Sequence, residues 1–360
     1  MDHFVGTKPV AASHAFDSAA LQAHLEREMP GFEGPLTVEQ FKGGQSNPTY
    51  KLITPARAYV MRTKPGPAAK LLPSAHAVER EFRVMKALYG TDVPVAKMHV
   101  LCEDEAVIGR AFYVMEFMDG RVLWEQSLPD MSKAERGAYY DEVNRVIAAL
   151  HQVNPAAVGL ASYGKPGNYF ERQIARWSKQ YLASVTESIP EMDRLIEWLP
   201  VHLPASARDD SQVSVVHGDY RLDNVVFHKT EPRIIAVLDW ELSTLGHPMA
   251  DFSYHCMAWH IPAGVFRGIG GLDHAALGIP TEHDYVRRYF ERTGRGNDMA
   301  ASMADWNFYL AYNLFRLASI TQGIAKRVVD GTASSAQAKA SGAATRALAE
   351  MGWKFAQTSN

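Results

Sequence analysis

The composition of the 360-residue chain is that of a globular protein, with 47% hydrophobic residues and enough length for two domains or lobes. Its net charge of −3 gives no general basic field, so we expect no binding of nucleic acid or membrane by bulk electrostatics. The two cysteines, Cys102 and Cys256, exclude a disulfide framework and favour a reducing compartment. The chain shows neither a signal-peptide pattern nor the ~18 apolar residues of a membrane span. We therefore expect a soluble, cytoplasmic protein.

The first third of the sequence predicts mainly strands. An N-terminal extension over residues 1–33 contains one predicted helix, "FDSAALQAHLEREM", with Asp17 as its N-cap and apolar residues at spacing four. The later elements of this region are three period-two runs within 36–62, a helical pattern over 73–90, and strand candidates near 97–101 and 110–118. Residues 34–118 are thus predicted to form an antiparallel sheet with one helix.

The remainder, residues 119–360, is predicted to be mainly helical. Ser132 and Glu135 form a capping-box pattern before an apolar stripe, and apolar residues recur at spacings of three and four through 303–324. The small-residue stretch 330–350 predicts a loop that becomes a helix on the outside of the fold. Strands followed by helices in this order are typical of an α+β protein with two lobes.

A concentration of polar groups lies in "VVHGDYRLDNVVF", residues 215–227, between two apolar runs. Asp219 and Asn224 are five apart in this loop, and Asp239 ends another β-rich run, "RIIAVLDW". Oxygen-bearing side chains on loops at strand ends suit Mg²⁺, which prefers oxygen ligands and keeps water and phosphate as the others. Taken alone, a polar loop with Asx-turns would explain these residues as well.

A second motif, "FKGGQSNPTYKL", lies between two strand candidates. The backbone of Gly43 and Gly44 can approach a phosphate closely, with Ser46 and Asn47 as additional donors. Two adjacent glycines are also typical of a hairpin turn. The motif indicates a phosphate-binding loop only because it precedes the other motifs of the chain.

The motifs, in this order, resemble those of the aminoglycoside phosphotransferase-like kinases over residues 34–260. "HGDYRLDN" looks like their catalytic loop and "LDWE" like their metal-binding segment. "GQSNPTY", "HAVEREFRVMKAL" and "AVLDWELSTLGHPMAD" resemble more closely the kinase-like domain found fused to acyl-CoA dehydrogenases and its stand-alone bacterial relatives. The resemblance implies a two-lobed protein-kinase-like fold, with a small β-rich N-lobe over 34–118 and a larger helical C-lobe over 119–360.

The resemblance also implies an enzyme, a small-molecule kinase that uses ATP and Mg²⁺ to phosphorylate an alcohol group. Asp219 would orient the acceptor hydroxyl and take its proton, while Asn224 and Asp239 would hold Mg²⁺ on the ATP phosphates. Family position favours a hydroxy acid or a hydroxyacyl-CoA as the acceptor. The choice between ATP and GTP and the oligomeric state stay open.

A cation for the phosphates is expected from the N-lobe. Where protein kinases have a lysine, "YVMR" ends in Arg62, whose guanidinium can bind phosphate bidentately, and Lys64 is the alternative. Glu81 lies on the apolar stripe of its helix, where a carboxylate needs a positive partner, so we expect it to pair with this cation. Glu79 is placed instead for a surface pair with Arg83.

The segment "YVMEFMDG" resembles the hinge that binds adenine, with backbone groups near Glu116 and Met118 for the edge of the base. The alternative function is a nucleotide-binding pseudokinase that regulates a partner without turnover. A phosphohydrolase is more distant, because it would leave the glycine motif, Arg62 and Glu81 without a purpose.

Several neighbours of the catalytic loop are interpreted as structural. Arg221 and Asp223 are expected to shape the loop through an ion pair or backbone contacts, and His217 through hydrogen bonds to the backbone. Asp251, in "GHPMADFSYH", resembles a family residue that braces the loop from below.

Overall fold

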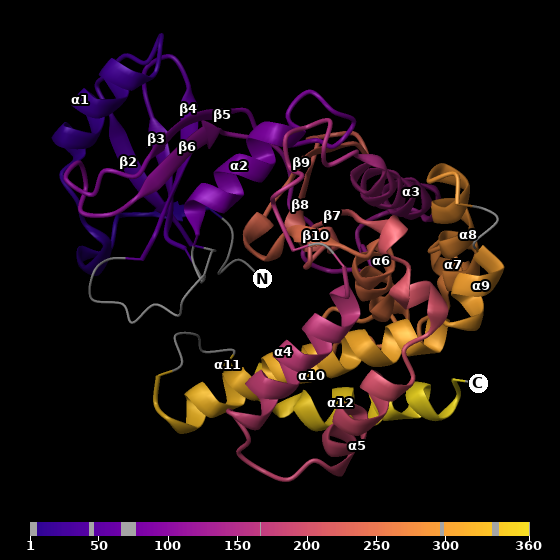
Figure 1. The fold of residues 1–360 in the computed structure, drawn as a ribbon. Coiled ribbons are helices and arrows are strands. Elements are labelled where there is room, and N and C mark those ends of the chain that lie inside the picture. The colour runs from indigo at the N-terminus through magenta and orange to yellow at the C-terminus, as the bar shows by residue number, and fades with distance from the viewer. Residues whose placement is uncertain are drawn as a thin grey trace. The chain divides into compact units, whose positions relative to one another are not determined.

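The computed structural model describes residues 6–42, 47–65, 77–165, 167–295, 299–332 and 338–359. The chain divides into two compact units, Met1–Trp124 with Val225–Ser243, and Glu125–Asn224 with Thr244–Asn360. The first unit carries the large sheet and the second is mainly helical (Figure 1). We had expected residues 119–360 to form one lobe, whereas 225–243 cluster with the first unit.

The sheet of the first unit is antiparallel throughout, in the strand order β1-β2-β3-β4-β6-β5. Its strands are β1 (Thr7–Lys8), β2 (Thr37–Phe41), β3 (Thr49–Ile53), β4 (Ala58–Thr63), β5 (Met98–Cys102) and β6 (Phe112–Glu116). The predicted meander over 36–62 is confirmed as β2, β3 and β4, since period-two runs separated by turns pair in sequence order.

The two faces of this sheet carry different helices, α1 (Ser18–Glu28) and α2 (Val78–Leu88). Leu21 and Leu25 of α1 share one hydrophobic core with Tyr50 of β3 and Met61 of β4, all of them fully buried. Because side chains alternate along a strand, Arg62 of β4 lies on the opposite face, on the side of α2. The helix expected in an N-terminal extension is therefore part of the core of the first unit.

Residues 225–243 join the first unit through backbone hydrogen bonds. They form β8 (Val225–Phe227), β9 (Ile234–Val237) and a 3-10 turn, η5 (Trp240–Leu242). Phe227 and Arg121 exchange two backbone hydrogen bonds of 2.8 Å, and the Val237 N–H donates to the Pro94 carbonyl at 2.8 Å. A sequence pattern cannot reveal such pairings, because each joins residues about a hundred positions apart or more.

The second unit is built around α10 (Trp306–Val329), which packs against α4, α5, α11 and α12 (Figure 1). Its other helices are α3 (Lys133–Gln152), α4 (Tyr169–Leu182), α5 (Pro190–Val201), α6 (Pro248–Cys256), α7 (His274–Leu277), α8 (Glu282–Arg292), α9 (Met299–Ala304), α11 (Ala338–Ala343) and α12 (Thr345–Gln357). Two short strands, β7 (Ser214–Val216) and β10 (Thr244–Gly246), pair antiparallel. Among the described helices, none is long and apolar enough to cross a membrane.

The stretch 330–350 is predicted to end as a helix on the outside of the fold, and α12 begins within it. This helix packs one face along α10 and α5, where it buries Leu348, Ala349 and Gly352, while Ala347 and Glu350 are exposed. Small residues permit this close approach, because a Cβ on Gly352 would lie 3.2 Å from Leu195 Cδ1 and 3.3 Å from Leu314 Cβ.

Two buried histidines, one at the start of α6 and one within it, are held neutral. His247 caps the helix, since its Nδ1 accepts from the Met249 N–H at 3.2 Å while its Nε2 lies 2.9 Å from the Ser206 carbonyl. His255, inside the helix, makes a 2.9 Å contact with the Tyr285 hydroxyl. Burial is the main cause that lowers the pKa of each histidine to about 4.

These histidines should make the protein less stable in mild acid. Below pH 6.5, the ordinary pKa of a histidine, both histidines are protonated in the unfolded chain but stay neutral in the folded protein. The unfolding free energy therefore decreases as the pH falls from about 6.5 towards 4. Each histidine should lower the unfolding free energy by roughly 1 to 2 kcal/mol between pH 7 and pH 5. Urea unfolding measured at several pH values tests this.

The matched variant is His247→Asn, which retains an N-cap acceptor but cannot titrate. Its unfolding free energy should fall less steeply with acid than that of the wild type. An unchanged pH slope would show that His247 is already protonated in the folded protein.

Candidate active site

The loop that carries Asp219 is held at its base by one carboxylate, Asp251. The backbone N–H groups of His217 and Gly218 donate to Asp251 Oδ2 and Oδ1 at 2.7 and 2.8 Å. His151 Nε2 also lies 3.2 Å from Oδ2. Gly218 has a φ of +83°, a conformation that glycine adopts at little cost, so the chain can turn sharply before Asp219. The bracing role expected for Asp251 is confirmed by these contacts.

Asp251 and His151 are both completely buried. Burial alone would raise the pKa of Asp251, but the hydrogen bonds from His151 and from the His217 N–H outweigh it and lower this pKa. Burial lowers the pKa of His151, which as a neutral ring can still donate from Nε2. An ionised carboxylate therefore accepts from three donors, as its buried charge requires.

The carboxylate of Asp219 is fixed by three side chains of the second unit. Its Oδ1 accepts from the Tyr254 hydroxyl at 2.7 Å, and its Oδ2 lies 3.0 Å from Asn224 Nδ2 and 3.3 Å from Arg221 Nη2. The Asp219 N–H donates to His217 Nδ1 at 3.2 Å, the backbone contact expected for this histidine. The Asp219 side chain is 17% exposed, so it is oriented by protein groups while remaining reachable.

Tyr254 and Arg316 belong to this arrangement and were missed by sequence analysis. The guanidinium of Arg316 donates to the Gly218 carbonyl and lies over the Tyr254 ring, with 4.7 Å between Cζ and the ring centroid. Burial, followed by the charge of Asp219, raises the pKa of Tyr254, which keeps its hydroxyl a donor. The available signal was Arg316 itself, a charged residue in the buried stripe of α10, where it needs polar partners.

Asp223 is a buried residue of the same loop that pairs with two arginines. Its carboxylate is 1% exposed and pairs with Arg221 Nε at 3.4 Å and with Arg267 Nη2 at 2.8 Å. The ion pair expected between Arg221 and Asp223 is confirmed, whereas Arg267 is an additional partner from a segment that the sequence did not single out.

In the first unit, Arg62 pairs with Glu81 as expected, with Nε 3.3 Å from Oε2. Glu81 is 1% exposed and also accepts from Asn47 Nδ2 and from the Tyr113 hydroxyl, each at 3.0 Å. Burial raises the pKa of Glu81, and Arg62 and these two donors oppose that rise. Asn47, expected to donate a hydrogen bond to phosphate, is completely buried, and its side-chain amide donates to Glu81.

Arg62 also binds two acidic residues of the "LDWE" segment. Its Nη2 lies 3.1 Å from Asp239 Oδ1 and 3.2 Å from Glu241 Oε2. Burial alone would lower the pKa of Arg62, but the carboxylates, Glu81 first, raise it, so the guanidinium stays charged. Asp239 is held with φ 63° and ψ 60°, in the left-handed region that few non-glycine residues adopt.

The remaining predicted residues divide into two groups. Gly43, Gly44 and Ser46 lie outside the described residues. Lys64 binds Glu79 at 3.0 Å, a partner other than the Arg83 expected for that glutamate. Glu116 ends β6, where its N–H donates to the Lys97 carbonyl at 2.9 Å, and Met118 follows it, half-buried.

The site residues thus belong to two sets, one in each unit. Asp219, Asn224 and their partners lie in the second unit, and Arg62, Glu81 and Asp239 lie in the first. The residues of the second unit present an oriented carboxylate, Asp219, that can accept a proton. Those of the first unit present a charged guanidinium, Arg62, among carboxylates. Asn224 and Asp239 each carry a side-chain oxygen of the type that Mg²⁺ prefers.

Comparisons with known proteins identify the family of the chain. Residues 37–293 match the model of the phosphotransferase enzyme family. Acyl-CoA dehydrogenase family member 10 of Mus musculus is 45% identical over 353 residues, which are 97% of this chain and 32% of that protein. The chain spans about one third to less than half of the length of the curated relatives it matches.

Solved structures show the same fold. A crystal structure from Ralstonia eutropha, provisionally named as an aminoglycoside phosphotransferase, is 64% identical with a TM-score of 0.87, covering 96% of this chain and 100% of that one. Aminoglycoside phosphotransferase APH(4)-Ia, in complex with ADP and hygromycin B, is 15% identical with a TM-score of 0.58, covering 93% and 97%. At that identity the likeness shows the fold alone. With a family match over most of its length and a two-lobed kinase-like fold, the chain belongs to the phosphotransferase enzyme family.

Proposed function

We propose that this protein transfers the γ-phosphoryl group of ATP to a hydroxyl group of a small molecule. The observation that carries the proposal is the Asp219 carboxylate, held by Tyr254, Asn224 and Arg221 on a loop braced by Asp251. Phosphoryl transfer requires mainly positioning and charge neutralisation, so a few fixed groups are sufficient.

In the proposed reaction, Asp219 orients the acceptor hydroxyl and takes its proton. The acceptor oxygen forms a bond to the γ-phosphorus while the bond from that phosphorus to the β,γ-bridging oxygen breaks, and ADP leaves with the electron pair. Tyr254 and Asn224 keep the carboxylate pointing in one direction, which lowers the entropic cost of reaching this geometry.

Asn224 and Asp239 are proposed as the residues that hold Mg²⁺. Because the amide nitrogen of Asn224 donates to Asp219, its carbonyl oxygen is the atom that would be left to bind the ion. When bound, Mg²⁺ would neutralise phosphate charge. Asp239 is then proposed to exchange part of its contact with Arg62 for the ion.

Arg62 is proposed to bind the ATP phosphates, positioned by Glu81. Gly43, Gly44 and Ser46 are proposed to approach the same phosphates. For adenine we propose backbone groups of the hinge at Glu116 and Met118. Since the Glu116 N–H already donates to Lys97, the Glu116 carbonyl and the Met118 N–H are the better candidates.

For the acceptor we propose a hydroxy acid or a hydroxyacyl-CoA. The curated relatives carry the name acyl-CoA dehydrogenase, which connects the chain with acyl chemistry rather than with antibiotics. APH(4)-Ia binds hygromycin B, but its 15% identity carries no argument for that acceptor here. We also propose a reducing, cytoplasmic location, since Cys102 and Cys256 are both free and buried.

The second candidate is a pseudokinase that binds nucleotide without turnover. The ion pairs of Arg62 with Asp239 and Glu241 favour a pseudokinase, because these pairs already neutralise the two residues proposed to bind Mg-ATP, Arg62 and Asp239. The oriented carboxylate of Asp219 favours the enzyme, since nucleotide binding alone does not need a proton acceptor.

The first prediction concerns the proton acceptor. Asp219→Asn should retain binding of Mg-ATP but lose turnover by on the order of a hundredfold or more, because the amide cannot take the proton. Nucleotide affinity is measured by calorimetry and turnover by ADP release with a panel of hydroxy acids and hydroxyacyl-CoA esters. Asp330→Asn, at an exposed surface ion pair, is the matched control. Equal turnover in wild type and Asp219→Asn would remove Asp219 from the mechanism.

The second prediction concerns the metal. ATP should raise the thermal unfolding midpoint of the wild type in Mg²⁺, and chelation of the ion should remove most of that increase. Asp239→Asn should lose the Mg²⁺-dependent part, because a neutral amide is a weaker ligand.

Adenosine, which has no phosphates, serves as the control ligand and should affect wild type and Asp239→Asn alike. A Mg²⁺-dependent shift of normal size in Asp239→Asn would contradict the assignment. No shift with any nucleotide in the wild type would contradict the proposed function itself.

A further inference from the structure

A pocket of the second unit is lined by two of the side chains that hold Asp219. Its lining residues are Gln126, Arg221, Tyr254, His255, Met257, Ala258, Ile261, Phe266 and Arg267. Two of them, Tyr254 and Arg221, are hydrogen-bonded or ion-paired to Asp219, at 2.7 and 3.3 Å. A molecule in this pocket would therefore contact side chains that themselves contact Asp219, and a hydroxyl group on it would have to extend past them to reach the carboxylate.

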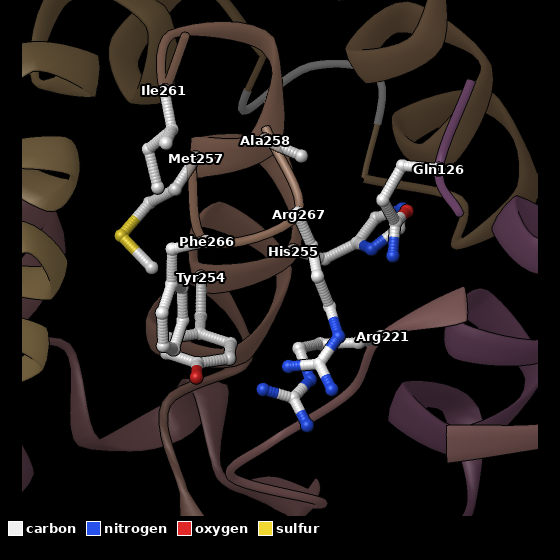
Figure 2. Close-up of a pocket in the computed structure, with 9 residues that line it drawn as sticks. All are labelled: Gln126, Arg221, Tyr254, His255, Met257, Ala258, Ile261, Phe266 and Arg267. Carbon is white, nitrogen blue, oxygen red and sulfur yellow. The ribbon is translucent and has the colours of Figure 1, made fainter. Parts of the chain in front are cut away.

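The charged lining of this pocket is basic. Arg221 and Arg267 contribute guanidinium groups, which lie near each other in Figure 2, and no lining residue is an Asp or a Glu. The carboxylate of Asp223, which is 1% exposed, pairs with one guanidinium nitrogen of each arginine. Arg267 is 33% exposed and carries five N–H donors, so the one ion pair that it makes among the described residues, with Asp223, leaves donors for a ligand.

The opposite part of the lining is apolar. Met257, Ile261 and Phe266 are grouped on the side of the Tyr254 ring (Figure 2). Hydrocarbon can be buried against these side chains, while an anionic group reaches the arginines. This combination suits a molecule that has both an apolar chain and a negative charge.

The segment that supplies Phe266 and Arg267 is held in a strained backbone conformation. The two residues have φ of 37° and 62°, each in a region that non-glycine residues avoid at a cost of about 1–3 kcal/mol. Backbone hydrogen bonds of 2.7–2.8 Å hold the segment: Gly268 N to Val265 O, Ile269 N to Ala258 O, and Gly270 N to Ile261 O. The fold thus places both side chains in the pocket, and such strain is typical of functional sites.

We propose that this pocket binds the acceptor through an anionic group, a carboxylate or a phosphate, which Arg267 together with Arg221 recognises. Met257, Ile261 and Phe266 bind the hydrocarbon part. The inference rests on the proposed function, since it assigns an acceptor class to the same site, and it argues against cationic acceptors. Burial and the like charge of Arg221 lower the pKa of Arg267, and a bound anion would relieve both effects.

The test uses probes that lack a hydroxyl group and cannot be phosphorylated. Hexanoate, hexyl phosphate and the neutral hexanamide are titrated calorimetrically into the full chain without nucleotide. At least one anion should bind the wild type tenfold or more tightly than the amide, because a charge-assisted contact is lost with the amide. Tighter hexanoate identifies a free acid as the acceptor, and tighter hexyl phosphate identifies a phosphate-bearing one.

The variant Arg267→Met should lose this preference, with the anions binding no better than the amide. Arg287→Met, which removes an exposed arginine of the same unit, should bind all probes as the wild type does. Because Arg267→Met leaves Asp223 with one partner fewer, Arg267→Lys is also titrated. It keeps the charge but loses the fork, and should retain part of the preference.

Equal binding of anions and amide by the wild type would overturn the inference, as would an unchanged preference in Arg267→Met or no binding of any probe. None of these outcomes involves ATP, so phosphoryl transfer would still stand. Conversely, anion binding that depends on Arg267 would stand even if no nucleotide altered the protein.

Discussion

The loop that carries Asp219 depends on one buried carboxylate, that of Asp251. It binds two successive backbone N–H groups, those of His217 and Gly218, and so fixes the chain immediately before Asp219. Without that anion, two buried backbone donors and the His151 ring would lose their acceptor, at a cost of about 1–3 kcal/mol for each unsatisfied group. The orientation of Asp219 is therefore set from α6, a helix that follows it in the chain by about thirty residues.

Much of this could be predicted from sequence because the relevant patterns are local. The sheet follows from period-two runs, and the pairing of Arg62 with Glu81 follows from a carboxylate on an apolar helical stripe. Tyr254 and Arg267 could not be found in this way. Each meets the catalytic loop only through the tertiary fold, and neither departs from the local pattern of its own segment.

The division of the chain is a further case where local pattern was insufficient. Residues 225–243 contain two short apolar runs that are typical of a strand pair, but their assignment to the first unit depends on backbone bonds to Arg121 and Pro94. Asn224 ends the part that belongs to the second unit, and Val225 begins the part that belongs to the first. The two metal-site candidates, Asn224 and Asp239, are therefore connected by a short stretch of chain although they belong to different units.

The triple ion pair of Arg62 has a consequence for the protein between turnovers. Glu81, Asp239 and Glu241 converge on one guanidinium, and three carboxylates without it would repel one another. Arg62 serves as a resident counter-ion, so this part of the first unit needs no divalent cation to keep its shape. In the proposed function, the charges of Mg-ATP would compete with this existing salt bridge. The net affinity would then be the difference between two sets of ionic contacts, so we propose moderate binding with ready release of ADP.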